Sequence, residues 1–213
     1  DGHYAANQEK AVSIPPKAER LPPGKTSFLE TTNQRTIDEL CSAQGLVPSQ
    51  IVKVLVMLAK VEDGQLQPLL LSLRGDQELN EVKLINALTK KLGKGVVEVM
   101  PITAEKLSAQ GLKSLPFGAL GPDLDDSLLS GAKSWVPRFL RLVDATAAEL
   151  NCFVCGSNKS DQHRTHVSWS TLGGTPPGVD LRKAKAGDNC VHDPSQKFEE
   201  KRGIEIGHIF QLG

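Results

Sequence analysis

A single lysine lies inside an apolar, strand-like run of the sequence. Lys53 lies within Ile51 to Ala59, where aliphatic and β-branched side chains predict a largely buried strand. An ammonium group in that setting needs a partner or a wet cavity, because burying an isolated charge is costly. The alternative is an edge-strand lysine that points to solvent, which the general exposure of charged residues favours. The residues alone leave both interpretations open.

Two histidines and an aspartate accompany strand-like segments further along the chain. His163 and His166 are three residues apart on an alternating run, so they should face opposite sides of a sheet and cannot form a paired metal site. Asp144 follows the strand expected at 139–143 and precedes a helix. It is therefore a candidate helix N-cap, although the end of a strand is also where sites are built.

Four cysteines raise the question of a metal site. Cys152 and Cys155 have the spacing of zinc ligands, but Cys190 and His192 are separated by one residue, which makes a strained chelate. The favoured alternative is a pair of buried free thiols on a strand. We therefore assign no metal ligands.

Gly118 to Pro122 forms a glycine loop without the lysine of a Walker motif or the spacing of a dinucleotide fingerprint. Its backbone N–H groups can still face a cleft from a tight turn. The sequence contains no G-x-S-x-G elbow and no H-E-x-x-H motif. If the protein is a hydrolase, we expect water rather than a side chain to attack.

Helices and strands that would position these residues can be read from capping and periodicity. Thr36 and Glu39 form a capping box, and the helix that follows should end at Gly45. The runs 51–61 and 66–73 predict a hairpin of buried strands. Asp76 is expected to cap a second helix that Gly93 ends.

The rest of the chain adds shorter elements. We expect strands at 96–99, 139–143 and 163–169, a short helix at 103–110, an exposed insertion at 121–134, and alternating residues in the tail from Ile204 to Leu212. The sum is an α+β fold with a mixed central β-sheet and packed helices.

Composition limits the classes of function. The 213 residues carry 25 Lys+Arg and 25 Asp+Glu, so the zero net charge excludes a generic polyanion binder. Aromatic residues make up only 4%, which makes a base-stacking platform a poor first hypothesis. The sequence has no apolar run of about 20 residues and no secretion signal. The cysteine usage fits a reducing cytosol, and the missing initiator Met suggests a segment of a longer chain.

Three long motifs carry a resemblance that covers nearly the whole chain. They are the head from Tyr4 to Ala11, the run Arg74 to Lys83, and the tail from Lys201 to Gly213. The second is close to R-G-D-H-E-L-N-E-V-K, with Gln77 in place of the usual His. Together they resemble the inserted editing domain of bacterial-type prolyl-tRNA synthetases, which shares the fold of YbaK-like aminoacyl-tRNA deacylases.

The resemblance implies a set of site residues. The matching positions are Lys53, Asp144 and His163 as catalytic residues, and Thr31, Ile37, Leu40, Gly118, Gly121 and Pro122 as substrate-binding residues. Our hypotheses for their roles are a lysine near the phosphate or ester and loop N–H groups at the carbonyl. Asp144 would meet the α-ammonium group, and His163 would shape the pocket with the apolar residues.

The resemblance also implies a reaction and partners. Water would hydrolyse alanine wrongly esterified to proline tRNA, without a cofactor, whereas ATP and magnesium would serve the host synthetase. The partners would be the alanine-bearing acceptor end of tRNA(Pro) and the rest of a synthetase chain that is generally dimeric and cytoplasmic. A non-catalytic domain that positions tRNA or braces the core is the alternative.

The expected organisation has three parts. Residues 1–20 would belong to the synthetase core and a linker, 21–198 to the editing domain, and 199–213 to a strand that returns to the core. An insertion must leave and re-enter its host at neighbouring points, so segments 1–11 and 201–213 are expected to pair. Residues 123–135 lengthen the connection after the glycine loop relative to the family pattern.

Overall fold

The computed structural model describes residues 6–7 and 10–201, and it divides the chain into two compact units. The larger unit spans 17–183, and the smaller combines the segments on either side of it. In the smaller unit, β1 (Ser13–Ile14) pairs with β10 (Asn189–Cys190) in an antiparallel bridge, and Ser13 Oγ donates to Asp188 at 2.6 Å. The predicted pairing of 1–11 with 201–213 and the alternating tail lie almost wholly outside the described residues.

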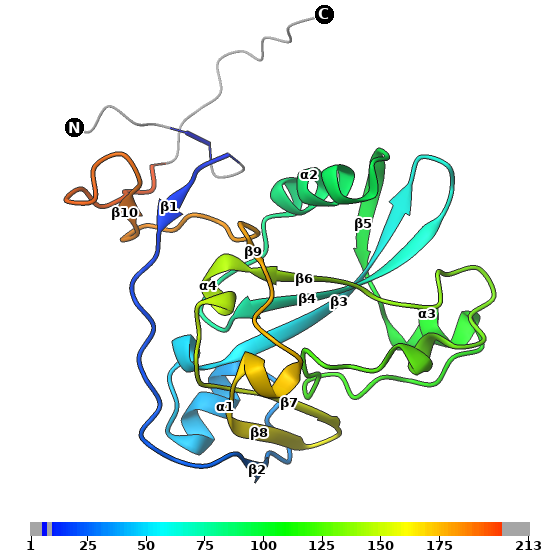
Figure 1. Cartoon of the computed structure of the whole chain (residues 1–213), viewed down its shortest axis with the longest axis horizontal. Coiled ribbons are helices and arrows are strands. Elements are labelled where there is room, and N and C mark those ends of the chain that lie inside the picture. Colours follow the sequence, from blue (N-terminus) through cyan, green and yellow to red (C-terminus); the bar gives the residue numbers. More distant parts are fainter. Residues whose placement is uncertain (1–5, 8–9, 202–213) are drawn as a thin grey trace, which may run out of the picture. The chain divides into compact units, whose positions relative to one another are not determined.

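A mixed five-stranded sheet forms the centre of the larger unit, in the order β5-β3-β4-β6-β9 (Figure 1). Its strands are β3 (Val52–Val61), β4 (Leu66–Arg74), β5 (Val96–Pro101), β6 (Leu140–Asp144) and β9 (Gly178–Val179). The predicted hairpin is confirmed, since β3 and β4 are antiparallel neighbours, while β6 runs parallel to β4. The α+β prediction with a mixed sheet is therefore confirmed.

Helices cover both faces of this sheet because its strands alternate between two apolar clusters. Leu69, Leu71 and Leu73 pack with Leu84 and Leu88 of α2 (Glu81–Leu92). The opposite face packs against α3 (Ala104–Ala109) and the segment that follows it. A strand rich in apolar residues on both faces is what such a sheet requires.

A smaller three-stranded antiparallel sheet lies beside the first, in the order β2-β8-β7. It consists of β2 (Ser27–Glu30), β7 (Phe153–Lys159) and β8 (Gln162–Val167). An isolated bridge between Ile51 and Val154 connects the beginning of β3 to β7. Leu40 of α1 (Ile37–Gln44) packs on this junction, so α1 is fixed where the two sheets meet.

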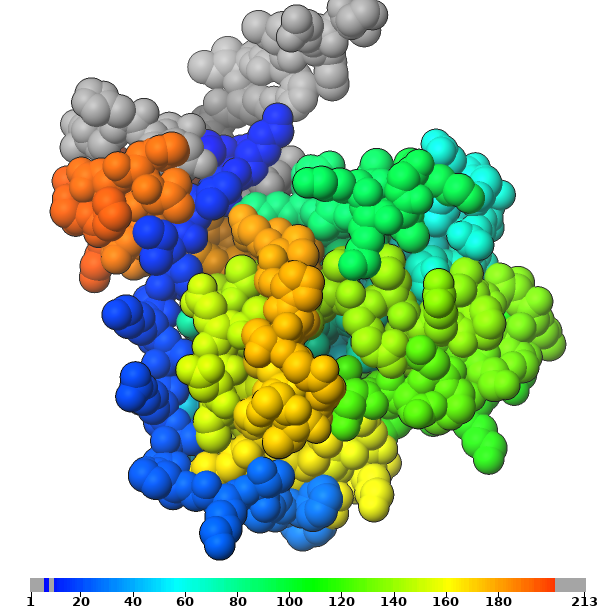
Figure 2. Space-filling view, in the orientation of Figure 1, coloured from blue at the N-terminus to red at the C-terminus, as the bar shows by residue number. Residues whose placement is uncertain are grey.

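Four further short elements belong to the larger unit. They are 3-10 helices at Pro48–Gln50, Asp126–Leu129 and Trp169–Leu172, and α4 (Ala145–Ala148) follows β6. The segment after Leu172 crosses the face shown in Figure 2, where it is amber, and carries β9.

Two expectations about the elements are wrong. Asp76 does not cap α2: Asn80 does, accepting from Lys83 N at 3.1 Å, while Asp76 binds Arg74 through contacts of 2.6 and 2.8 Å. The segment 121–134 is not simply an exposed insertion, because Leu124 and Leu129 are completely buried in the core. Within the described residues, no helix has the length and apolar character to cross a membrane.

Candidate active site

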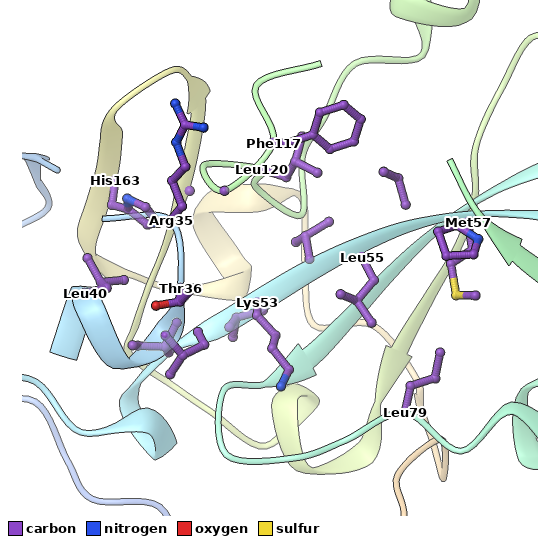
Figure 3. A pocket seen from close by; sticks show the side chains of 18 of the residues that line it. Arg35, Thr36, Leu40, Lys53, Leu55, Met57, Leu79, Phe117, Leu120 and His163 are labelled. Carbon is purple, nitrogen blue, oxygen red and sulfur yellow. The ribbon is translucent and has the colours of Figure 1, made fainter. Parts of the chain in front are cut away.

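A pocket of about 530 Å³ opens where the two sheets meet. One side of it is the first half of β3, and the other sides are α1 with its capping segment, the glycine loop, and strands β7 and β8 (Figure 3). Most of the lining side chains are aliphatic. The described residues that line it include no Asp, Glu, Ser or Cys, and their charged groups are Lys53 and Arg35.

Lys53 is half-buried and lines the pocket. Strand β5 pairs with β3 only from Met57 onward, so the part of β3 that carries Lys53 is open on that side. Its Nζ donates to the carbonyl of Gly75 at 3.0 Å. That carbonyl is fixed, because Gly75 N donates to Ile51 O at 2.8 Å. The ammonium group is thus held at the pocket by the backbone of the neighbouring strand end.

His163 contributes a buried imidazole to the pocket and is 6% exposed. Its Nδ1 lies 2.8 Å from Thr31 Oγ1, and its ring also hydrogen-bonds the backbone of Gly118. Burial lowers the pKa of His163 below its ordinary value, against the opposing effect of the Gly118 contact. The neutral ring that results satisfies both neighbours, with Nδ1 accepting from Thr31 and the other nitrogen donating to Gly118.

Thr31 supports the site without lining the pocket. It is 1% exposed, and its N–H donates to Asp161 O at 2.8 Å. Its contact with the pocket is through the hydrogen bond to His163. The prediction that His163 and His166 face opposite sides of their strand agrees with the alternating burial of β8, in which His163 is buried and His166 half-exposed.

The glycine loop closes the pocket opposite β3. Ala119 N donates to Pro116 O at 2.9 Å, and Gly118 has a φ of +89° that favours glycine. In the part of the chain that the structure describes, the N–H groups of Gly118 and Leu120 donate to no protein acceptor. Both residues line the pocket.

A polar network holds the far end of the loop. Gly121 N donates to Asn158 Oδ1 at 2.6 Å, and Asn158 Nδ2 donates to Asp123 at 2.9 Å. Arg164 binds both carboxylate oxygens of Asp123 at 2.9 and 2.6 Å. Gly156 lets the loop approach β7, because a Cβ there would lie 2.2 Å from the Ala119 carbonyl.

The apolar wall at the α1 end consists of Ile37 and Leu40, as the resemblance implies. The predicted capping box is present: Glu39 N donates to Thr36 Oγ1 at 3.2 Å, and Thr36 N donates to Glu39 at 2.9 Å. The helix ends at Gly45, also as predicted. These caps fix the first turn of α1, which carries the two aliphatic side chains.

Besides Thr31, three implied site residues do not line the pocket. Asp144 is fully buried and caps α4, as the N-cap interpretation predicted: its Oδ1 accepts from Thr146 N at 3.0 Å and its Oδ2 from Leu181 N at 2.9 Å. Gly121 and Pro122 form the buried end of the loop and do not line the pocket. The carboxylate of Asp144 therefore organises the backbone that follows β6 and the segment at Leu181.

Several contributors were not identified from the sequence. Gly156 and the Asp123–Asn158–Arg164 network position the loop, and Arg35 and Phe117 lie at the rim of the pocket. Among these residues, only Phe117 could have been identified from the sequence, because it is one of few aromatic residues and directly precedes the glycine loop. The network depends on the pairing of β7 with β8, which no local motif reveals.

The cysteines do not form a cluster. Cys155 is buried, and burial raises the pKa of its thiol to about 12, whereas Cys152 is exposed, so the expected pair of buried thiols is wrong for Cys152. Cys190 belongs to the smaller unit. Among the residues with described positions, no three His, Cys, Asp or Glu side chains gather as metal ligands.

Comparison with known proteins gives a family match. The model of the aminoacyl-tRNA editing domain matches residues 31–172, which includes the whole pocket. A proline–tRNA ligase of Prochlorococcus marinus (strain MIT 9313) is 68% identical over all of this chain, and one of Synechococcus sp. (strain CC9311) is 62% identical. The chain spans 36% of the length of each of these relatives.

Proposed function

The chain belongs to the aminoacyl-tRNA editing domain family, and from this premise we propose that it is the editing module of a proline–tRNA ligase. In this role it hydrolyses the ester of alanine wrongly attached to tRNA(Pro). The observation that carries the proposal is the pocket itself. It combines one fixed ammonium group, two unoccupied backbone N–H groups and a small aliphatic wall.

The lining favours attack by water. Thr36 is the hydroxyl residue in the described lining, and its oxygen already accepts the cap hydrogen bond from Glu39 N. A covalent route requires an activated nucleophile, which this lining does not offer. The chain instead supplies position and charge, and these are large contributions to ester hydrolysis.

Each group has a distinct role in this proposal. The N–H groups of Gly118 and Leu120 stabilise the oxyanion that forms when water adds to the ester carbonyl. Lys53 holds the negatively charged acceptor end or the developing charge. His163 remains neutral and fixes the glycine loop, while Ile37 and Leu40 bound the space for the methyl side chain of alanine.

Size explains the need for a second site. An aminoacylation pocket built for proline binds the smaller alanine only about 1–3 kcal/mol less favourably. The two amino acids differ there by a few apolar atoms, and the loss of those contacts is the only basis for discrimination. A hydrolytic pocket with an aliphatic wall admits the smaller residue and excludes the larger one.

The proline–tRNA ligases that this chain resembles are much longer than the chain itself. We propose that the rest of the synthetase supplies proline activation, with ATP and magnesium, and most of the affinity for tRNA. Ester hydrolysis here needs no cofactor. The host is proposed to be a cytoplasmic homodimer, and 1–20, 21–198 and 199–213 remain the proposed core, editing and return segments.

Deacylation tests the proposal. Ala-tRNA(Pro) and Pro-tRNA(Pro) are each incubated with the chain, with Lys53→Ala, and with Lys60→Ala. Lys60 lies on the same strand but is exposed and outside the pocket, which makes it a matched control. We expect alanine release that spares proline, survives Lys60→Ala and falls at least tenfold in Lys53→Ala.

Absence of hydrolysis by the chain and by the full-length ligase would refute the proposal. The remaining explanation would then be a domain that positions tRNA or braces the synthetase core. Hydrolysis unaffected by Lys53→Ala would move the site away from this pocket.

A further inference from the structure

An aromatic ring stands at the rim of the pocket. Phe117 lines the pocket yet is 40% exposed, whereas its neighbour Leu120 is 7% exposed and completes the core. A flat partner that covered this ring would gain the free energy of burying its apolar surface. In Figure 3 the ring projects from the glycine loop on the side of the pocket away from Lys53.

The backbone that carries the ring is well fixed. Phe117 N donates to Leu115 O at 2.8 Å, and Leu115 is buried in the core. The next turn is closed by the hydrogen bond from Ala119 N to Pro116 O at 2.9 Å. Phe117 therefore sits in a defined position one residue before the free N–H group of Gly118.

We propose that Phe117 is the stacking platform for the nucleobase of the nucleotide that carries the ester. This inference rests on the proposed function, because it assumes that Gly118 N–H meets the ester carbonyl. The ester and the base are attached to the same ribose. The base of that nucleotide is therefore separated from the ester carbonyl only by the sugar ring. An exposed ring next to the oxyanion donor is where the base arrives.

A positive charge accompanies the ring on the same rim. Arg35 is exposed, lines the pocket, and extends in Figure 3 toward the same side as Phe117. Its backbone packs on the glycine loop, since a Cβ on Gly118 would lie 3.3 Å from Arg35 Cα. An aromatic platform beside a cation is the usual combination for holding a single-stranded nucleic acid end.

Stacking on Phe117 should not distinguish one base from another. Every base has a π-face, so the platform recognises the presence of a base rather than its identity. The few aromatic residues of the chain do not argue against it, because one well-placed ring is sufficient for one base. The discrimination between alanine and proline remains a property of the aliphatic wall.

Two alanyl esters separate stacking from chemistry. One is 3′-O-alanyl-adenosine, and the other is the alanyl ester of the same sugar without its base. For Phe117→Ala we expect kcat/KM for the adenosine ester to fall about 5- to 150-fold, while kcat/KM for the base-free ester stays unchanged. Phe117→Tyr should retain the preference for the adenosine ester, and Phe117→Leu, which keeps the apolar bulk, should lose it.

Phe28→Ala is the matched control, because Phe28 is 63% exposed on β2 and does not line the pocket. It should leave both esters unaffected. Equal loss on both esters in Phe117→Ala, or retention of the preference in Phe117→Leu, overturns the proposal. If the unmodified chain and the full ligase hydrolyse neither ester nor Ala-tRNA(Pro), the proposed function itself fails.

Discussion

At the scale of single residues, the imidazole of His163 shows how the pocket is held together. It is buried between Thr31 and the Gly118 backbone, and one ring nitrogen accepts while the other donates. Protonation would give Nδ1 a hydrogen that faces the Thr31 hydroxyl, which can then only accept. Thr31 can satisfy either form, but burial disfavours the charged ring, and this lowers the pKa of His163.

This preference predicts a pH dependence of stability. Below the ordinary pKa of about 6.5, the unfolded chain binds a proton at His163 that the folded chain resists. The free energy of unfolding should therefore fall as the pH drops below about 6.5, by at most ~1.4 kcal/mol per pH unit from this site. Urea unfolding of the protein and of His163→Gln between pH 5 and 8 gives the free energy of unfolding of each. The difference between the two free energies at each pH is the contribution of His163.

The difference should be constant above about pH 7 and shrink as the solution becomes acidic. His166→Gln is the control, since His166 lies on the opposite side of the same strand. A difference that does not vary with pH would mean that His163 is not held neutral by the fold.

Asp144 provides the second prediction at this scale. Removing its carboxylate in Asp144→Ala leaves the buried N–H groups of Thr146 and Leu181 without their acceptor. We expect the free energy of unfolding to fall by about 2–5 kcal/mol, because each unsatisfied buried donor costs roughly 1–3 kcal/mol. Deacylation per folded molecule should change little, since Asp144 does not line the pocket.

Asp125→Ala is a suitable comparison for this variant. Asp125 also caps a short helix, accepting from Ser127 N at 2.7 Å, but it is exposed. Its loss should cost no more than about 1 kcal/mol. A stable Asp144→Ala protein that has lost deacylation would instead make Asp144 part of the catalytic site.

At the scale of elements, the glycine loop depends on its contact with β7. Gly156 is where the two approach each other, and a Cβ would meet backbone atoms of Ala119 and Leu120 at 2.2–2.4 Å. Backbone cannot move aside as a flexible side chain can. The loop must therefore shift as a whole, and it takes with it the N–H groups of Gly118 and Leu120.

Gly156→Ala should thus reduce deacylation more than it reduces stability. We expect at least a tenfold lower kcat, since displacements of about 1 Å can cost a hundredfold, with ~1–3 kcal/mol of destabilisation. Gly95→Ala is the matched control, because its Cβ would meet only the movable end of the Glu62 side chain. Full activity of Gly156→Ala would show that the loop does not position the reacting groups.

Local chemistry in the sequence is sufficient to predict the elements that have local causes. Thr36, Glu39 and Gly45 define α1 through backbone hydrogen bonds within one or two turns. The prediction failed at Asp76 because Arg74, two residues away, binds its carboxylate, and this leaves Asn80 to cap α2. It failed at 121–134 because Leu124 and Leu129 pack against residues distant in sequence.

The site was predictable only in part for the same reason. Lys53, His163 and the glycine loop were identified through their match to a family, and the structure does bring them to one pocket. Gly121 and Pro122 form the buried end of the loop, where Asn158 of β7 accepts a hydrogen bond from Gly121 N. The positions of these residues depend on how the two sheets pack together, and short-range sequence patterns carry no information about that packing.

At the scale of the whole molecule, the balance of charge determines how the chain can use tRNA. With 25 basic and 25 acidic residues it has no net field to attract a polyanion. The cations at the pocket are Lys53 and Arg35 among the described residues. Contact with phosphate should then be local and limited to the acceptor end.

This predicts weak and weakly salt-dependent binding of tRNA(Pro) by the chain alone. Neutralising one or two phosphates gives a slope of log K against log[salt] of about −1 to −2, because each contact contributes about −0.9 for duplex and −0.7 for single-stranded regions. Fluorescence anisotropy from 50 to 300 mM salt measures this slope, and Arg35→Ala should bring the slope closer to zero by somewhat less than one.

Lys60→Ala, which removes an equal charge outside the pocket, should leave the slope unchanged. A slope of about −5 or steeper would instead mean that a broad surface of the chain binds tRNA, and the dependence on the rest of the ligase would have to be abandoned.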